Sequence, residues 1–265
     1  MSLAERQEIW LWSPALERHV SLTILLPPNT DGSTQLSILI LNDGQDFDRL
    51  QLPQTLRNLF EKNTAPQPFL IAGIHCNEDR MNEYGTASQA DYAGRGSRAK
   101  NHTNFVINEL LPFLRQQFRC RTEQSATAIA GFSLGGLSAM DIAWANGKLF
   151  GKVGVFSGSL WWRSQPFVAT DPDGHRIMHD LIRNAASKNE GMKFWLEAGT
   201  RDENDDRNGN GIIDAIDDTL DLIRELKQKG YEDHDIRYVE VAGGEHNPDT
   251  WGKVMPDFLQ WAFGK

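Results

Sequence analysis

The sequence lacks several features that would place it in a specialised class of protein. It contains two cysteines in 265 residues, Cys76 and Cys120, with no Cys-x-x-Cys or Cys/His spacing. This scarcity excludes a disulfide framework and gives no indication of a zinc site, so we expect two buried thiols. No apolar run approaches the ~18 residues of a transmembrane helix, and we therefore expect no membrane partner.

Positive charge is also scarce. The 27 Lys and Arg residues are outnumbered by 36 Asp and Glu residues, which gives a formal net charge of −9. Because nucleic-acid binding depends on Lys and Arg neutralising phosphates, this balance argues against a nucleic-acid partner. Residues 1–12 lack a basic start and an apolar segment of secretory type. We therefore expect a cytoplasmic protein, or a periplasmic or secreted one if an export signal has been removed.

Apolar runs alternate with helix-like segments along the chain. Such runs are what a parallel sheet covered on both faces requires, so the pattern predicts an α/β fold with a mostly parallel, doubly wound sheet. No linker divides the chain, and we expect a single domain over residues 1–265. The predicted strands are 20–26, 36–41, 69–75, 126–131, 153–157, 193–198 and 236–241, and the predicted helices are 52–63, 103–118, 137–145, 175–188, 215–229 and 251–263.

The residues Gly131-Phe132-Ser133-Leu134-Gly135 lie between a predicted strand and a predicted helix. Strand, Gly-x-Ser-x-Gly and helix in that order are the nucleophile elbow of α/β-hydrolases. A serine in such a strained turn exposes its Oγ only if the residues two positions away on either side carry no side chain. The pattern therefore predicts Ser133 as a nucleophile in an α/β-hydrolase sheet of about eight strands.

A serine nucleophile needs a base and an orienting carboxylate, which follow it in the order acid, then base, in this fold. His246 comes shortly after the strand 236–241, in a small-residue segment that we interpret as a turn. The other histidines after Ser133 that we considered are His175, His179 and His234, which lie on or beside predicted helices and are expected at the surface. His246 is therefore the predicted base.

The acid is predicted at the end of the strand 193–198. Asp202 follows this strand through Gly199-Thr200-Arg201, and Glu203 and Asp205 are close alternatives. Each of them could also be a solvated carboxylate of an acidic loop.

Acyl transfer also needs N–H donors for the developing oxyanion. Leu134, the residue after the nucleophile, supplies one, and Gln45 in the segment 42–46 is the candidate for the second. The segment around Gln45 could equally be an ordinary β-turn.

Five blocks of sequence resemble the putative esterase family of α/β-hydrolases. This family includes enterobactin esterases of the Fes and IroE type, esterase D, feruloyl esterases and the mycolyltransferases of the antigen 85 group. The blocks run in order over nearly the whole chain, so together they are far more specific than any one of them. They are residues 41–45, residues 73–75 with 80–84, residues 128–137, residues 157–162, and residues 243–246 with Trp251.

The resemblance implies roles for matching positions. It implies Ser133 as nucleophile, His246 as base and Asp202 as acid, with Gln45 and Leu134 as oxyanion donors. It also implies that a second group of residues is either structural or close to the substrate. The two tryptophans of this group are similar in position to aromatic residues that line the cleft. The members of this group are Arg80, Glu83, Tyr84, Trp161 and Trp162. For the two tryptophans, packing beneath the following loop is the alternative.

The segment 206–217 matches the calcium loop of EF-hands. Gly211 stands at position 6, and the candidate ligands are Asp206, Asn208, Asn210, Ile212 through its carbonyl, Asp214 and Asp217. Position 12 is Asp rather than the usual Glu, as in dockerin-type loops, and no matching helix precedes the loop. We hypothesise that Ca²⁺ neutralises this segment as a structural ion and fixes Asp202; a solvated acidic loop is the alternative.

Together these observations predict a serine carboxylesterase that needs no cofactor for catalysis and acts on a small-molecule ester. A siderophore-type or acylated-sugar ester is one possibility. Two alternatives remain: an acyltransferase that uses the same acyl-enzyme, and a catalytically silent calcium-binding protein of the hydrolase fold. The strained elbow argues against the silent protein, because nothing would preserve such strain without a function.

Overall fold

The computed structural model describes residues 5–28, 33–61 and 67–264. These residues form one eight-stranded sheet in the order β1-β2-β4-β3-β5-β6-β7-β8. β2 is antiparallel to both β1 and β4, and all pairs from β4 to β8 are parallel. The strands are β1 (Glu5–Ser13), β2 (Arg18–Leu26), β3 (Ser37–Asn42), β4 (Phe69–Ile74), β5 (Thr127–Phe132), β6 (Lys152–Phe156), β7 (Lys193–Arg201) and β8 (Ile236–Glu245).

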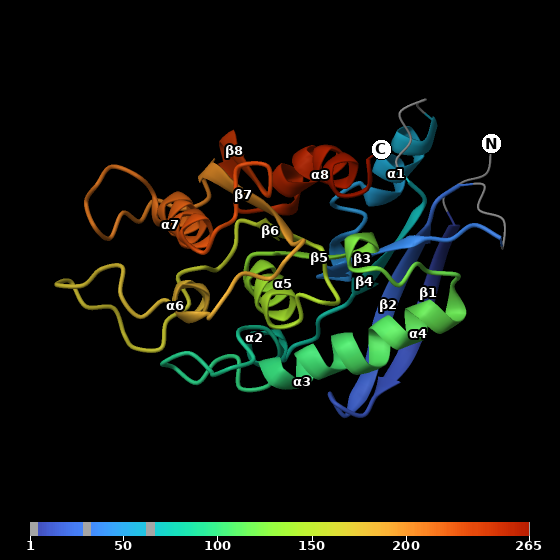
Figure 1. Cartoon of the computed structure of the whole chain (residues 1–265), viewed down its shortest axis with the longest axis horizontal. Coiled ribbons are helices and arrows are strands. Elements are labelled where there is room, and N and C mark those ends of the chain that lie inside the picture. The colour runs from blue at the N-terminus through green and yellow to red at the C-terminus, as the bar shows by residue number, and fades with distance from the viewer. Residues whose placement is uncertain (1–4, 29–32, 62–66, 265) are drawn as a thin grey trace.

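Helices cover both faces of the sheet (Figure 1). The first layer consists of α1 (Leu52–Glu61) and α8 (Pro248–Phe263). The second contains α5 (Leu134–Ala145), α6 (Ile177–Asn184), α7 (Asp214–Gln228) and the consecutive segments α3 (Ala99–Asn104), η2 (Phe105–Leu110) and α4 (Leu111–Gln117). Short helical turns are η1 (Gly44–Asp46), α2 (Arg80–Glu83) and η3 (Gln124–Ala126). The predicted three-layer α/β-hydrolase architecture is confirmed.

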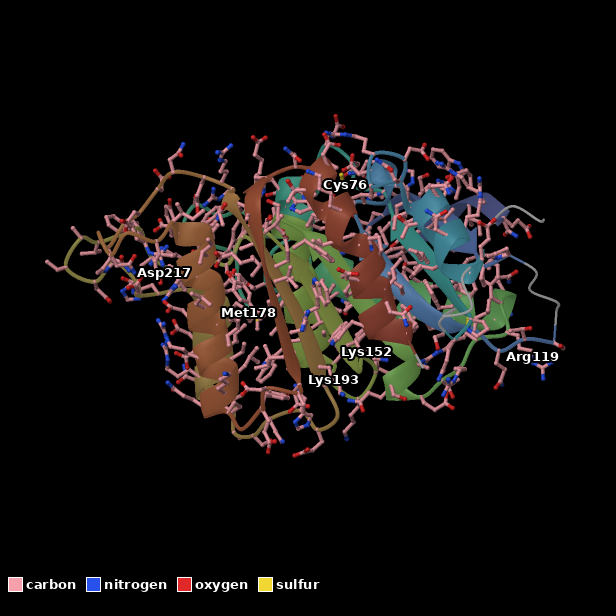
Figure 2. The ribbon with its side chains drawn as sticks, turned by 90° about the horizontal axis from the view of Figure 1, so that it is seen from above. Cys76, Arg119, Lys152, Met178, Lys193 and Asp217 are labelled. Carbon is pink, nitrogen blue, oxygen red and sulfur yellow. The ribbon has the colours of Figure 1, made fainter. Side chains whose placement is uncertain are left out.

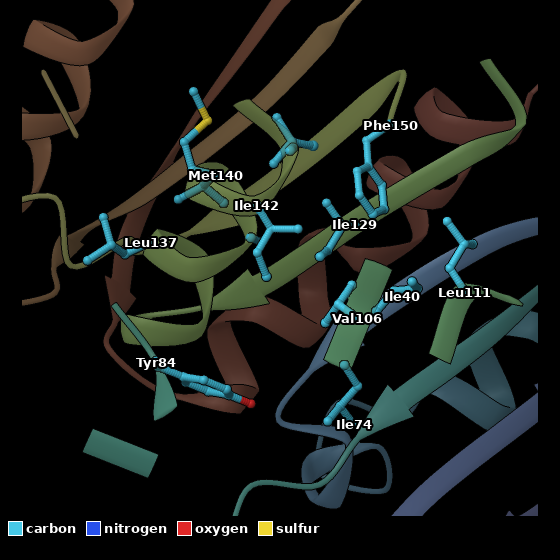
Figure 3. Close-up of a cluster of buried hydrophobic side chains, with 14 of the residues drawn as sticks. Ile40, Ile74, Tyr84, Val106, Leu111, Ile129, Leu137, Met140, Ile142 and Phe150 are labelled. Carbon is cyan, nitrogen blue, oxygen red and sulfur yellow. The ribbon is translucent and has the colours of Figure 1, made fainter. Parts of the chain in front are cut away.

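The central strands are buried along their whole length because both faces of the sheet are covered. Every residue of β3, β4 and β5 is buried. Their side chains alternate between two hydrophobic clusters, one on each side. Figure 3 shows part of one cluster, in which Ile40 and Ile74 of the sheet lie near Val106 and Ile142 of the covering helices. Continuous apolar sequence therefore identified these strands correctly.

The carboxyl ends of the parallel strands share one edge of the sheet. Figure 2 shows Cys76, just past the end of β4, at this edge, and shows Lys152 and Lys193, the first residues of β6 and β7, at the opposite edge. The segments that follow β3, β5, β6, β7 and β8 consequently meet at one side. This edge is where α/β sheets place their ligands.

β1 is absent from the sequence prediction. It lies at the edge of the sheet and pairs only with β2, so one of its faces meets solvent: Trp10 is 71% and Trp12 is 53% exposed. Its first four residues are polar and only Ile9–Trp12 are apolar, so no long apolar run marks this strand.

Several boundaries and one helix differ from the predictions: α5 and α8 begin earlier, at Leu134 and Pro248, and α6 is the shorter Ile177–Asn184. β7 and β8 extend to Arg201 and Glu245, so the segment 243–245 that we interpreted as a turn belongs to a strand. The predicted helix 103–118 is α3, the π-helical η2 and α4 in succession; Pro112, which lacks an N–H, lies in the first turn of α4. For the predicted helix 52–63, residues 62–63 lie outside the described residues.

His179 is a correction, because it was expected at the surface. It is 1% exposed, between α6 and α7, and shares a hydrogen bond of 2.9 Å between its Nε2 and the carbonyl oxygen of Asp218. Burial lowers the pKa of His179 well below its usual value, so it stays neutral. His234 is exposed and His175 is half-buried. The place of His179 in the sequence does not indicate that its face of α6 packs against α7.

Both cysteines are free and half-buried rather than fully buried. Within the described residues, no helix combines the length and apolar character needed to cross a membrane.

Candidate active site

Ser133 lies in a strained turn between β5 and α5, with φ 53° and ψ −123°. This region of backbone space is unfavourable for any residue with a side chain, and such strain clusters at functional sites. The flanking glycines allow the turn: a Cβ on Gly131 would lie 2.3 Å from the carbonyl oxygen of Gly135, and a Cβ on Gly135 would lie 2.6 Å from Asp43 Oδ2. The turn therefore has the steric properties that the Gly-x-Ser-x-Gly pattern predicts.

Ser133, Asp202 and His246 line the same cavity, of about 140 Å³. They follow β5, β7 and β8, which are parallel strands of the sheet order β5-β6-β7-β8, so their carboxyl ends share one edge. The hydroxyl of Ser133 is 3.3 Å from that of Ser159, which follows β6 and was quoted in the sequence only as part of a family block. Hydrogen bonds used in catalysis are often long in the free enzyme and shorten when the substrate binds. The 3.3 Å separation between the two hydroxyls is therefore compatible with a reactive serine.

Burial of His246 favours a neutral imidazole. Desolvation lowers the pKa of His246, the carboxylate of Asp202 opposes that change, and Arg80 adds to it, for a net decrease. Desolvation raises the pKa of Asp202, although hydrogen bonds from Ser157 and from the Gly199 N–H, and the charge of His246, counteract it. A neutral imidazole near pH 7 is the protonation state that a general base requires.

The two residues predicted as oxyanion donors are Leu134, which follows Ser133 in the chain, and Gln45, which lines a cavity together with Ser133. Leu134 is the first residue of α5, so no carbonyl of its own helix can accept its N–H. In η1 the first hydrogen bond is donated by the N–H of Asp46 to the Asp43 carbonyl. The N–H of Gln45 comes one residue earlier and takes no part in this bond. Gln45 and Ser133 line a second cavity of about 280 Å³, which also contacts His246.

Arg80 and Tyr84 hold the segment that carries Gln45. Arg80 donates from Nε and Nη2 to both carboxylate oxygens of Asp43, at 2.8 Å each, and its guanidinium lies 5.0 Å from the Tyr84 ring centre. The N–H of Asp43, which has φ 64°, donates to the Tyr84 hydroxyl at 3.2 Å. Arg80 lines the second cavity, whereas Tyr84 is buried and supports it.

Glu83 and Trp162 do not line these cavities and correct the expectation that they lie near the substrate. Glu83 is 1% exposed and accepts two hydrogen bonds from Arg18, at 2.8 and 2.6 Å. Trp162 is completely buried with its ring centre 5.6 Å from that of Trp161, so of the two tryptophans only Trp161 lines a cavity. Both residues are structural, because contacts inside the protein bury their side chains.

Trp161 connects the catalytic cavity to a third and larger one of about 420 Å³. Three aromatic side chains of this cavity remain 38 to 50% exposed: Tyr92, Trp161 and Phe167. Its remaining lining residues are Arg163, Asp205, Asp206, Arg207 and Asp214. Exposed aromatic rings that gather around a cavity are typical of ligand sites.

In the predicted calcium loop, positions 3, 5 and 12 converge. The amides of Asn208 and Asn210 donate to Asp217 Oδ2 at 2.7 and 3.1 Å, and α7 begins at Asp214 as expected for the exiting helix. Asp206 accepts the N–H groups of Asn210 and Gly211. In the part of the chain that the structure describes, no three carboxylate, imidazole or thiol groups gather as a metal centre.

Arginine neutralises part of the acidic segment, which the sequence argument did not anticipate. Arg207, 7% exposed, forms ion pairs with Asp173, Asp214 and Asp218. The repulsion expected among the carboxylates is therefore smaller than their number indicates.

The model of the family described as "Putative esterase" matches residues 13–262. The uncharacterized protein YbbA of Bacillus subtilis is 23% identical over 248 residues, which cover 92% of each chain. The iron(III) salmochelin esterase of Escherichia coli O6:H1 is 30% identical over 180 residues, which cover 65% of this chain and 41% of that protein. A ferulic acid esterase structure superimposes with a TM-score of 0.75 at 16% identity, covering 99% of this chain and 98% of that one, and shows the same fold.

Proposed function

Since this chain belongs to the putative esterase family and is a carboxylic ester hydrolase, we propose that Ser133 carries the acyl group between two half-reactions. The observation that supports this proposal is the strained turn of Ser133 at the sheet edge, with His246 and Asp202 on the same cavity. Fold alone would not indicate these residues, because one fold hosts many functions.

In the proposed mechanism, the Ser133 hydroxyl attacks the ester carbonyl while His246 accepts its proton. The N–H groups of Gln45 and Leu134 bind the oxyanion that forms. His246 then gives the proton to the leaving alcohol, and the acyl group stays on Ser133. Water attacks the acyl-enzyme with His246 again as base, which releases the carboxylic acid and restores the serine. Asp202 orients the imidazole and stabilises its charged form.

A fluorophosphonate probe tests the nucleophile directly, because it reacts with activated serines. We expect it to label the wild type at one site and to leave Ser133→Ala unlabelled. A catalytically silent protein would show no labelling in either form. Faster product release on addition of an alcohol acceptor would instead favour the acyltransferase.

We propose further that the 420 Å³ cavity beside Trp161 receives a hydroxylated ring of the substrate, a feature that siderophore-type and acylated-sugar esters share. The faces of Tyr92, Trp161 and Phe167 can stack on such a ring. Arg163 and Arg207 already donate to backbone carbonyls or carboxylates, so they offer little to an anionic group. Asp205, the lining carboxylate that the calcium site proposed below does not use, can accept hydrogen bonds from ring hydroxyls.

Two esters distinguish the sources of the ring: a dihydroxybenzoate ethyl ester and a 6-O-acetyl glucoside, each compared with ethyl acetate. We expect kcat/KM about fivefold or more above that of ethyl acetate for one of them, because a stacked ring contributes about 1 kcal/mol beyond its burial. Trp161→Ala should remove most of this advantage, and Trp10→Ala, at the far edge strand, should not. Equal kcat/KM values for all three esters would contradict the ring site.

We propose that Ca²⁺ binds the segment 206–217 as a structural ion, held by Asp206, Asn208, Asn210, Asp214 and Asp217 with the carbonyl of Ile212. The convergence of Asn208 and Asn210 on Asp217 supports this proposal, because rotation of the two amides would present oxygens instead of nitrogens. A fixed loop would restrict Asp202, which lies four residues before it.

Thermal unfolding with 1 mM CaCl₂ and with EDTA tests the ion. If the dissociation constant is near 10 µM, saturation stabilises the fold by about 2.7 kcal/mol, a rise in midpoint of about 5 °C or more. Asp206→Asn should weaken the response, and Asp233→Asn, on an exposed turn, should leave it intact. Identical midpoints and identical esterase rates in CaCl₂ and in EDTA would refute a structural ion.

A further inference from the structure

A second carboxyl group is buried behind the proposed acid. Glu197 lies on β7, is 1% exposed, and does not belong to the lining of the catalytic cavity. Its Oε2 is 3.4 Å from the Ser157 hydroxyl, and its Oε1 has no hydrogen-bond partner within the described part of the chain. The proposed mechanism gives this residue no role, although burying a carboxyl group in a core is costly.

Ser157 joins this carboxyl to the site. It follows β6 with φ 46°, a conformation that non-glycine residues rarely adopt, and its N–H donates to the Glu197 carbonyl at 2.9 Å. Its hydroxyl oxygen accepts the indole N–H of Trp251 at 2.8 Å. The single hydroxyl proton is donated to Glu197 Oε2, and Asp202, which lines the same cavity as Ser157, is the other carboxylate that could receive it.

Asp202 also has an unsatisfied oxygen. Its Oδ2 accepts the N–H of Gly199 at 3.1 Å, and its Oδ1 is buried without a hydrogen-bond partner among the described residues. A buried carboxylate, Glu197, and a half-buried one, Asp202, each have one unpartnered oxygen and share one nearby hydroxyl proton, so they repel each other when both are charged. One additional proton on the pair removes the repulsion and supplies a donor.

Glu197 is the member that keeps this proton. Burial and the nearby charge of Asp202 raise the pKa of Glu197 to about 8. Asp202 is less buried, accepts a backbone N–H and lies near His246, all of which favour its charged form.

We propose that Glu197 is a positioning residue that acts through Asp202: it remains protonated at neutral pH and leaves Asp202 as the one negative charge that faces His246. This inference rests on the proposed triad. With Glu197 neutral, the Ser157 hydroxyl is free to hold Asp202. When Glu197 ionises, the two carboxylates repel and compete for that hydroxyl, so Asp202 loses its fixed orientation and the rate falls.

The groups packed around Glu197 are few. Ser157 reaches it from the end of β6, Asp202 from the segment after β7, and Tyr238 from the neighbouring strand β8, where Glu197 helps to raise the pKa of the tyrosine. Trp251 of α8 acts on it through Ser157, and His246 acts through Asp202. None of these groups places a fixed positive charge against Glu197, so its proton is retained.

The kinetic test compares Glu197→Gln with Glu197→Leu across pH 5.5 to 9.5. Glutamine is neutral at every pH and keeps a donor, so we expect kcat at pH 7 within about twofold of wild type and loss of the decline in kcat near pH 8. Leucine removes the donor, and we expect kcat to fall about tenfold or more while KM changes little. Equal loss of kcat in both variants, with the alkaline decline intact, would overturn the proposal.

Stability against pH tests the same proton without catalysis. The folded-state pKa of Glu197 lies above its unfolded value, so the folded protein binds more protons between about pH 4.5 and 8 and loses stability as pH rises through that window. Glu197→Gln should remove this component and raise the thermal midpoint above wild type at pH 8, with a smaller difference at pH 4.5. An unchanged pH dependence would refute the protonated carboxyl, and this readout stands even if Ser133 proves not to be the nucleophile.

Discussion

Ser133→Ala is expected to lower kcat for p-nitrophenyl ester hydrolysis by about 10⁵-fold or more. The variant keeps the cavity and both N–H donors but has no hydroxyl to form the acyl-enzyme. In serine hydrolases, loss of the nucleophile costs about 10⁶ in kcat, and the remaining acceleration comes from the oxyanion donors and binding. Steady-state kinetics from acetate to octanoate esters measure the loss, and the chain-length profile indicates the acyl length that the site accepts.

Ser97→Ala is the matched control, because this exposed serine bonds only weakly to Asn82, at 3.5 Å. Its kcat should equal that of wild type. A Ser133→Ala protein that retains more than a few per cent of kcat, at a purity that excludes wild-type contamination, would contradict the acyl-enzyme.

Arg176→Met is expected to destabilise the protein by about 3 kcal/mol. Arg176 is 4% exposed on the side that faces α7, where it forms ion pairs with Asp218, at 2.5 Å, and with Asp221. Removing one partner of a buried pair leaves an uncompensated charge, which costs about 3–5 kcal/mol. We expect the lower end of that range because Asp218 keeps Arg207 and Asp221 keeps Arg224. Urea unfolding monitored by fluorescence measures the change.

Arg183→Met in α6, the helix that begins just after Arg176, provides the comparison. Arg183 is 50% exposed and pairs with Asp180, which is 39% exposed, and with Glu225, which is 11% exposed, so water can replace the first contact and only the second leaves a buried carboxylate. Its loss should cost less than the loss of Arg176, which is itself buried together with both of its partners. Similar losses at Arg176 and Arg183 would show that the α6–α7 contact does not depend on buried charge.

Local sequence predicted the features that depend on neighbouring residues. Continuous apolar runs identified β3 to β6, because strands covered on both faces leave no polar position. The steric demand of the turn around Ser133 is met by glycines two residues away, so the pattern is visible in five consecutive residues. The order of Ser133, Asp202 and His246 after successive strands likewise predicted that they would meet at one edge.

Features that depend on distant packing were not predicted. β1 was missed because its outer face meets solvent, and His179 was misplaced because only α7 decides which side of α6 is buried. Glu83 and Trp162 are buried by contacts from other parts of the chain, including Arg18.

The sequence by itself therefore determined the fold class, the elbow and the order of the proposed catalytic residues. Only the tertiary structure decided which groups surround them: Ser159 beside Ser133, the aromatic cavity beyond Trp161, and Glu197 behind Asp202. The physical reason is that strands and tight turns depend on residues adjacent in the chain, whereas burial and the protonation of a carboxyl group depend on what separate strands place next to it.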